Sequence, residues 1–285
     1  MLRHIITALS LLFLSTTLSI AQLVDSVSNG SIDWQQRMII ATGFGAPNKN
    51  MPPETWEIGS RKAAEIDAMA TLLGVVTGIT IDASVSVENF MTTHQEISAK
   101  VKGVLRNFKV IATRTRANGL TEVDVGIPID GNLANCFIPD LLEKKPPLRQ
   151  PQQQKPQEPE KSYTGLIIDA RGLGVRPAML PKVINENGEE VYGTGYVSRD
   201  YAVNQGIVGY SKQMDMARDV RPETVRRGWG LDARVGANPM VIKAIESSGS
   251  RRTDTVISND DAQRLHSMDS YLKLMHECKV VFLVD

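Results

Sequence analysis

Apolar residues in the first half of the chain recur with a helical period over residues 60–78, which read SRKAAEIDAMATLLGVVTG. Spacings of three and four residues predict an amphipathic helix here, and Gly78 is expected to end it. The predicted apolar face consists of Ala63, Ile66, Ala70, Leu73 and Val76. Because alanine leaves little bulk on this face, we expect the helix to pack closely on a sheet.

Strand patterns flank this helix. Residues 34–45 predict a strand that ends in a glycine turn at 41–47, and residues 79–87 alternate as a half-buried strand. A second helix is predicted over residues 90–105. Its expected apolar face consists of Phe90, Ile97, Val101 and Val104.

Residues 108–129 predict a hairpin, because Asn118-Gly119 can supply the positive φ angles of a two-residue turn between alternating strands. The resulting order is β-α-β-α-β-β. This order predicts an α+β layer, with two helices on a mostly antiparallel sheet.

The second half also predicts an α+β arrangement, again with helices on a mostly antiparallel sheet. Residues 164–172 predict a strand. Asn187-Gly188 predicts the turn of a hairpin between two short strands. Ser258 precedes acidic residues and an apolar stripe, which predicts a capped helix over 259–277. The expected stripe consists of Ala262, Leu265, Met268, Leu272 and Met275. Residues 278–285 are a short apolar run, which favours a buried closing strand.

Two further segments set the predicted organisation. Residues 143–162 alternate proline with glutamine and charged residues, a composition typical of an extended linker. Residues 1–21 combine Arg3, a short apolar stretch and small residues before Gln22, which is the pattern of a cleaved signal peptide. We therefore expect a signal peptide at 1–21, one α+β domain at 33–142, the linker, and a second α+β domain at 163–285.

Composition narrows the expected compartment and partners. The 32 basic and 32 acidic residues become 31 and 32 once Arg3 is removed with the signal peptide. This balance offers no electrostatic footprint for nucleic acid, so we expect no nucleic-acid partner. No later segment is apolar and long enough to span a membrane. The expected location is the periplasm, with peripheral association with the outer membrane or cell wall left open.

The chain has two cysteines, Cys136 and Cys278. An oxidising compartment would allow them to form a disulfide between the two halves, and two separate buried thiols are the equal alternative. Two cysteines with His94, His266 and His276 do not give a zinc spacing, so no metal or cofactor is expected.

The stretch YTGLIIDARGLGVRP, residues 163–177, resembles a strand that feeds a phosphate-binding loop. It has Gly172 and Gly174 but lacks the Gly-Lys-Ser/Thr ending that such a loop needs. We interpret it as a strand and a turn, with Asp169 and Arg171 as polar residues at the strand end. No serine elbow or zinc deaminase motif is complete either, so we expect no enzyme.

A basic stretch at residues 218–230 includes Arg226, Arg227 and Trp229. These three residues are candidate contacts for an acidic glycan or a protein partner. The alternative is a solvated loop whose tryptophan enters the core.

The first half resembles a known envelope domain. The features that carry the resemblance are Gly-x-Gly-x-Pro at 43–47, the alanine-rich helix, the expected strand that follows it in GVVTGITID at 74–82, VKGVL at 101–105 and the Asn-Gly hairpin. Over residues 39–133 this pattern is similar to the LPP20 lipoprotein domain, which flagellar basal-disk proteins and the N-terminal part of the flagellar T-ring assembly protein share. The second half looks like a segment that accompanies such domains in bacterial proteins. The chain departs from the lipoprotein pattern because it lacks a lipidated cysteine.

The resemblance implies assembly and no catalytic residue. We therefore expect a non-enzymatic, self-associating periplasmic scaffold or assembly protein of the cell envelope, in the flagellar case a ring or disk accessory. The alternative is a peptidoglycan- or carbohydrate-binding module. A third hypothesis, an enzyme with its site between the domains, would need a cleft with strongly perturbed titratable groups.

Overall fold

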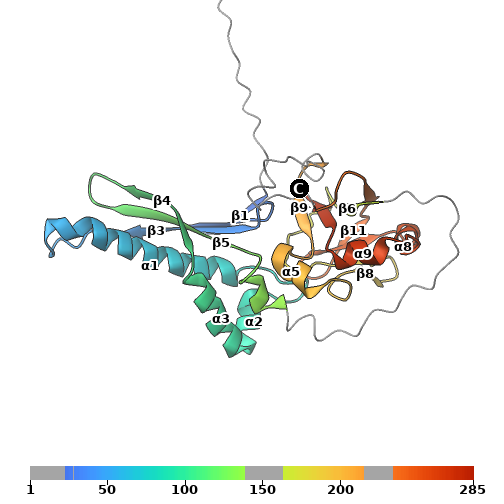
Figure 1. Ribbon diagram of the computed structural model, residues 1–285, viewed down its shortest axis with the longest axis horizontal. Coiled ribbons are helices and arrows are strands. Elements are labelled where there is room, and N and C mark those ends of the chain that lie inside the picture. The colour runs from blue at the N-terminus through green and yellow to red at the C-terminus, as the bar shows by residue number, and fades with distance from the viewer. Residues whose placement is uncertain (1–22, 28, 139–162, 215–233) are drawn as a thin grey trace, which may run out of the picture.

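The computed structural model describes residues 23–27, 29–138, 163–214 and 234–285. The predicted signal peptide at 1–21 and the predicted linker at 143–162 lie outside these ranges. Within them the protein consists of helices and sheets in two regions, and the α+β class is confirmed. Figure 1 shows the first region as an elongated body and the second as a rounder one beside it.

The first region is built on a five-stranded antiparallel sheet with the order β1-β2-β3-β5-β4. Its strands are β1 (Val24–Val27), β2 (Gly30–Asp33), β3 (Met38–Gly45), β4 (Lys109–Thr115) and β5 (Thr121–Pro128). The helix α1 (Trp56–Thr77) follows the short turn η1 (Pro53–Thr55) and lies along one face of the sheet (Figure 1). We call the sheet, α1 and the loop 46–55 between them the arm. The arm includes β1 and β2, which precede the predicted domain start at Asp33.

Helix α1 packs on β3 through backbone rather than through large side chains. A Cβ atom on Gly43 would lie 2.2 Å from the carbonyl oxygen of Ala64, and one on Gly45 would lie 1.9 Å from that of Ser60. The glycine pair therefore belongs to a strand, and the prediction of a glycine turn at 41–47 was wrong. Only glycine allows the helix to approach the strand this closely.

The buried face of α1 also differs from the predicted one. The structure buries Ser60, Ala64, Ala68, Leu72, Val75 and Val76. Of the predicted face, only Val76 is buried, and Ala63, Ile66 and Ala70 are exposed. The close approach at Gly43 and Gly45 explains the choice, because small side chains must face the strand there.

The segment after α1 holds two short helices in place of the expected strand and single helix. Residues 79–87 contain only an isolated bridge between Thr80 and Ser86. Helix α2 (Val87–Thr93) and helix α3 (Gln95–Leu105) are separated by His94, whose φ of −131° and ψ of 90° are extended. Phe90, Ile97 and Val101 are buried as expected, and Val104 is half-buried.

The hairpin between β4 and β5 is confirmed, and its turn is longer than predicted. The N–H of Gly119 donates to the carbonyl of Arg116 at 2.9 Å, and that of Arg116 donates to Leu120 at 2.8 Å. Gly119 has a φ of 81°, whereas Asn118 does not adopt a positive φ. A single left-handed glycine therefore closes this loop.

The second region contains a four-stranded parallel sheet with the order β10-β6-β13-β9. Its strands are β6 (Gly165–Asp169), β9 (Gly209–Ser211), β10 (Pro239–Lys243) and β13 (Val280–Leu283). A mostly antiparallel sheet was expected in this half, but these four strands are parallel and crossovers connect them. The closing strand β13 is fully buried in the middle of the sheet, as its apolar run predicts.

A smaller mixed sheet has the order β11-β12-β7-β8. Its strands are β7 (Val183–Asn185), β8 (Glu190–Tyr192), β11 (Glu246–Ser248) and β12 (Asp254–Ile257). The expected hairpin at Asn187-Gly188 is present between β7 and β8.

The described part of the second region also contains three short helices: α5 (Arg199–Gln205), α8 (Asn259–His266) and α9 (Tyr271–His276). The Ser258 hydroxyl accepts from the Asp261 N–H at 3.1 Å, so the predicted cap is confirmed. The predicted single helix is broken between α8 and α9. The break changes the helical phase, so Leu272 is exposed and Tyr271 is buried in its place.

The main apolar core runs through both regions, and a smaller buried cluster of Ile167, Val235, Val281 and Leu283 lies apart from it in the second region. Backbone hydrogen bonds also join the two regions: the N–H of Met179 donates to the Thr80 carbonyl at 3.0 Å, and that of Leu180 donates to Ile81 at 2.7 Å. The rings of Trp34 and Tyr210 meet edge to face with centroids 5.8 Å apart. The two regions are therefore docked against each other rather than only tethered.

Candidate interaction site

The candidate partner contacts Arg226, Arg227 and Trp229 lie in the segment 215–233, outside the described residues. Cys136 and Cys278 are both buried and both free. The Cys136 thiol donates to the Asn132 carbonyl at 3.3 Å, and burial raises the pKa of the Cys278 thiol to about 11. The structure thus presents two separate protonated thiols, the second of the two alternatives open from sequence.

The stretch 163–177 is a strand and a turn, as interpreted. Strand β6 ends at Asp169, and the turn that follows places Gly172 at a φ of 80° and Gly174 at 62°. Arg171 forms an ion pair with Asp169 at 2.6 Å, and this bond lowers the pKa of the Asp169 carboxyl. The Gly172 N–H donates to the Asp285 carboxylate at 2.9 Å. Asp169, Arg171 and Asp285 thus all have partners within the protein.

The junction between the two regions contains a buried ion pair that sequence reasoning missed. The Arg37 guanidinium donates to both carboxylate oxygens of Asp130, at 2.6 and 2.7 Å, and to the Val208 carbonyl of the second region at 3.1 Å. Burial lowers the pKa of Arg37, and Asp130 more than offsets this, so the net shift is upward. A Cβ atom on Gly206 would lie 2.1 Å from Arg37 Nη2, which makes glycine necessary there.

A second buried arginine, Arg234, lies near the first. It donates to the carbonyl oxygens of Gly206 at 2.9 Å and Cys278 at 3.0 Å, and also to that of Gln205. Burial lowers its pKa to about 10, which leaves the guanidinium charged at neutral pH. Arg234 thus satisfies three buried carbonyl groups of the second region, which is a structural role.

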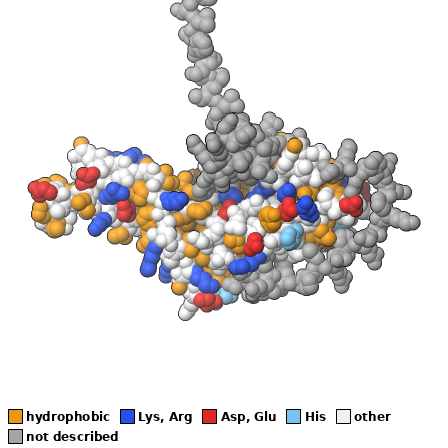
Figure 2. Space-filling model, in the orientation of Figure 1, with side chains coloured by type: hydrophobic (Ala, Val, Ile, Leu, Met, Phe, Trp, Pro, Cys, Tyr) orange, Lys and Arg blue, Asp and Glu red, His pale blue; other side chains and the backbone are white. Residues whose placement is uncertain are grey.

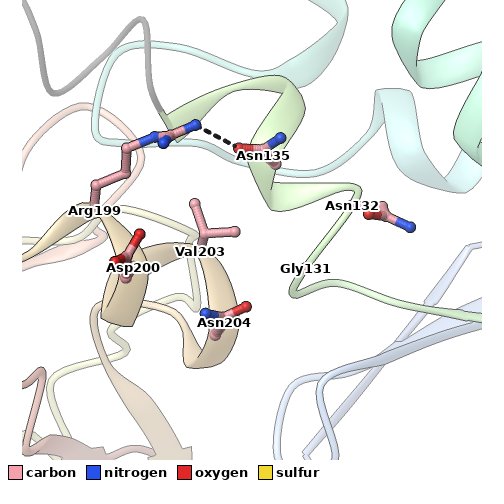
Figure 3. Close-up of a pocket in the computed structure, with 7 residues that line it drawn as sticks. All are labelled: Gly131, Asn132, Asn135, Arg199, Asp200, Val203 and Asn204. Carbon is pink, nitrogen blue, oxygen red and sulfur yellow. Dashed lines mark hydrogen bonds between the residues drawn. The ribbon is translucent and has the colours of Figure 1, made fainter.

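A small polar cleft lies beside the junction (Figure 3), with a volume of about 260 Å³. Arg199 and Asn135 point toward one another across it, and the guanidinium donates to the amide oxygen at 3.1 Å. The lining residues are Gly131, Asn132, Asn135, Arg199, Asp200, Val203 and Asn204. This set can hydrogen-bond a polar ligand and contains no serine, cysteine, lysine or histidine nucleophile. The buried arginines Arg37 and Arg234, whose pKa values are shifted, are not among these lining residues.

The described residues contain no group of three or more histidine, cysteine, aspartate or glutamate side chains that could hold a metal ion. They also include no helix with the length and apolar character needed to cross a membrane.

The arm carries most of the exposed apolar surface of the described residues. Twelve large apolar side chains are exposed, and eight of them belong to the arm. These eight are Val24, Val27, Phe44, Met51, Ile58, Ile66, Val110 and Ile111. Figure 2 shows apolar side chains interspersed with charged ones along this elongated body. These side chains are spread over β1, β3, α1, β4 and the loop 46–55, so the arm exposes more large apolar side chains than the described part of the second region does.

The sheet face opposite α1 carries a polar ladder. Arg114 donates to both carboxylate oxygens of Asp124, at 2.6 and 2.9 Å, and the Thr42 hydroxyl donates to the same carboxylate at 2.7 Å. Arg114 and Arg116 both pair with Glu122. The ladder sits next to the apolar Ile111, whose side chain lies over Gly126. This face is suited to contact another macromolecule.

The arm sheet has two edge strands. Strands β1 and β4 are its outer strands, and both have exposed side chains along their length. Lysine and arginine on β4 and a bulge at Val110–Ala112 blunt its edge against uncontrolled pairing. The β4 edge of the arm is thus protected by its charged side chains and by the bulge.

Sequence reasoning missed the Arg37–Asp130 pair because its residues are 93 positions apart. It missed the exposed face of α1 because the helix has more than one apolar face and the sequence does not show which one is buried. One signal in the sequence does bear on α1. Isoleucine and alanine recur at four-residue intervals on two sides of this helix, and a helix on a sheet can bury only one of them.

Residues 165–285 match a protein-family model that is described as the second domain of Treponema pallidum Tp0624. The matched segment is the second region, which covers less than half of the chain. The comparison with curated proteins gives no match for this chain.

Proposed function

We propose that this protein is a non-enzymatic scaffold or assembly protein of a bacterial cell envelope, exported to the periplasm and acting through protein–protein contacts. The observation that carries the proposal is the exposed apolar surface of the arm, on the region that resembles the LPP20-type envelope domain. A ring or disk accessory of the flagellum is the version that this resemblance favours.

Three further features support the proposal. The signal-peptide pattern at residues 1–21 favours export. The family match of the second region is to the second domain of Treponema pallidum Tp0624. The polar cleft at the junction is lined by one carboxylate, that of Asp200, and by no serine, cysteine, lysine or histidine, and the buried arginines Arg37 and Arg234 are not among its lining residues.

The test follows the full-length chain in a bacterial cell. Mass spectrometry of the recovered protein should give an N-terminus at Gln22, and osmotic shock should release it from the periplasm. Amine cross-linking in the intact envelope should shift it into discrete complexes larger than the monomer. A protein that keeps residues 1–21 and remains in the cytoplasm would overturn the proposal.

The cleft in Figure 3 favours one alternative, a carbohydrate- or peptidoglycan-binding module. Its three asparagines, Arg199 and Asp200 are side chains that hydrogen-bond sugar hydroxyl and acetamido groups. Pull-down on purified sacculi separates the two functions. Retention that is lost in both Asn135→Ala and Arg199→Ala would favour the binding module, and no retention would favour the scaffold.

A further inference from the structure

A basic segment without acidic residues runs from helix α3 into strand β4 and the turn that follows it. Residues 97–121 contain six lysine and arginine side chains and no aspartate or glutamate, although the whole chain has 32 basic and 32 acidic residues. The six are Lys100, Lys102, Arg106, Lys109, Arg114 and Arg116. The charge of the chain is therefore locally unbalanced in this part of the first region.

Two of these six charges are neutralised by the neighbouring strand, and four are not. Arg114 pairs with Asp124 and Glu122, and Arg116 pairs with Glu122. The other four side chains are exposed and make no ion pair within the described part of the chain. Helix α3 has one acid, Glu96, which lies in its first turn at the opposite end from β4. We call the four unpaired side chains the basic patch; they are Lys100, Lys102, Arg106 and Lys109.

The basic patch is continuous and lies on a projecting element. Lys102 and Arg106 are four residues apart on the exposed side of α3, so their side chains are neighbours. Lys109 begins β4 three residues later, and three residues of chain span at most about 11 Å. In Figure 1, α3 projects from the layer that α1 and the sheet form, and Figure 2 shows Lys and Arg side chains on this projection.

Two exposed aliphatic side chains of β4 adjoin the basic patch. Val110 is 40% exposed and Ile111 is 55% exposed. Lys109 is opposite Gly126 in the strand register, and the Ile111 side chain lies over the same glycine. Lys109 and Ile111 therefore lie side by side on the sheet face opposite α1. Elements that bind a membrane surface combine basic side chains with exposed apolar ones in this way.

We propose that the basic patch, together with Val110 and Ile111, docks the first region onto the surface of a membrane that carries anionic phospholipids. Clusters of four or more lysine and arginine residues are attracted to anionic headgroups, and each cation gives a several-fold gain in affinity. The aliphatic pair favours a bilayer over an acidic protein, because a bilayer has an apolar layer directly beneath its charged surface. The inference rests on the proposed function, since an exported envelope protein faces such membranes.

The expected binding is reversible and depends on salt. Four cations and two aliphatic side chains hold a protein less firmly than two lipid chains or a spanning helix would. Attraction to the headgroups acts over about one screening length, which is about 30 Å at ~0.01 M salt and about 8 Å at ~0.15 M salt. We therefore expect binding to strengthen with the content of anionic lipid and to weaken as salt is added.

Vesicle sedimentation tests the proposal. The chain is used from Gln22 onward, because the apolar stretch within residues 1–21 would itself bind lipid. Vesicles of equal parts phosphatidylcholine and phosphatidylglycerol should sediment the protein, and vesicles of phosphatidylcholine alone should not. Lys102→Glu combined with Arg106→Glu should weaken the binding by at least about tenfold.

The matched control reverses two other lysines. Lys49→Glu combined with Lys62→Glu changes the net charge by the same amount, at exposed lysines that make no ion pair within the described part of the chain. At ~0.15 M salt this variant should bind within about threefold of the wild type, because screening confines each charge to its surroundings. Equal binding by the two double variants would overturn the proposal, and so would a wild type that does not bind the phosphatidylglycerol vesicles. Retention on immobilised polyglutamate without binding to vesicles would also overturn it and would assign the basic patch to an acidic protein.

A fluorophore at residue 111 tests whether the aliphatic pair meets the bilayer. Both natural cysteines are buried, so a thiol-reactive dye labels an introduced cysteine with little background. Ile111→Cys with an environment-sensitive dye should shift its emission to the blue when the phosphatidylglycerol vesicles are added. Ile245→Cys is the matched control, since Ile245 is 49% exposed in the second region, and its emission should not shift. A shift at both positions, or at neither, would overturn the proposal. These results are independent of export and of cross-linking in the envelope, which test the proposed function.

Discussion

The two main sheets of this protein bury their strands to different degrees. In the parallel sheet of the second region, β13 is buried at every position and β6 at all but its last. In the antiparallel sheet of the arm, every residue of β4 except Ala112 is exposed. The second region buries its strands within the chain, whereas the arm leaves apolar side chains exposed.

The difference follows from strand direction. A parallel sheet needs crossover connections, and these connections cover its faces. An antiparallel sheet can be built from hairpins, so a single helix on one face is enough. The arm thus depends on one tight helix–strand contact for its stability, and its other surfaces remain available for function.

The largest effect is expected at that contact. Gly43→Ala places a Cβ atom 2.2 Å from the backbone of both Ala64 and Ala68, and neither backbone can move without separating α1 from β3. Overpacking of this kind typically costs about 1–3 kcal/mol, and we expect the upper end or more because the obstacle is backbone. Urea denaturation followed by circular dichroism measures the loss.

Gly103→Ala is the matched control, since a Cβ atom on Gly103 in α3 meets nothing within 4 Å. This variant should be as stable as the wild type or up to about 1 kcal/mol more stable. If Gly43→Ala behaved like Gly103→Ala, the close packing of α1 on β3 would be wrong, and the arm would need another source of stability.

The next effect is expected at the junction that joins the two regions. Asp130→Ala leaves the buried guanidinium of Arg37 without its carboxylate, and loss of one partner of a buried pair typically costs about 3–5 kcal/mol. Because Asp130 retains some exposure, we expect a smaller loss, about 2–3 kcal/mol. Calorimetry should also show the two regions unfolding less cooperatively, since Arg37 bonds the Val208 carbonyl across the junction.

A double-mutant cycle controls for changes unrelated to the pair. Arg37→Ala combined with Asp130→Ala should cost clearly less than the sum of the two single variants, because each single variant leaves one buried charge behind. Simple additivity would mean that the two side chains contribute independently and that the junction is held by its apolar core alone.

Much of the architecture could be predicted from the sequence. The α+β class, the hairpin between β4 and β5, the cap at Ser258 and the buried strand β13 all follow from local signals that tertiary contacts reinforce. Where prediction failed, tertiary contacts chose between local alternatives. On α1, the predicted face that includes Ala63 and the buried face that includes Ala64 are both rich in apolar residues. The glycines of β3 determine which face is buried.

The functional surfaces were harder to predict for a related reason. The Arg37–Asp130 pair joins residues 93 positions apart, so no local pattern indicates it. The exposed residues Ala63, Ile66 and Ala70 of α1 have the helical spacing of a core face in the sequence. Only the structure shows that the opposite face of the helix packs on the sheet.

The smallest effect is expected on the open face of the arm sheet, where Arg114 pairs with Asp124. Its hydrogen bonds are the main cause that holds the pKa of the Asp124 carboxyl below its usual value. A carboxyl whose pKa is depressed in the folded state adds stability above its unfolded pKa of about 3.9, and this stability is lost as the pH falls through the folded pKa. Arg114→Ala should therefore raise the pKa of Asp124, as NMR titration of its carboxyl carbon would record. The variant should differ slightly in stability from the wild type at neutral pH and converge with it in strong acid. An unchanged Asp124 titration would mean that the ladder is not formed in solution, and it would leave this face of the arm less ordered than the α1 face that packs on the sheet.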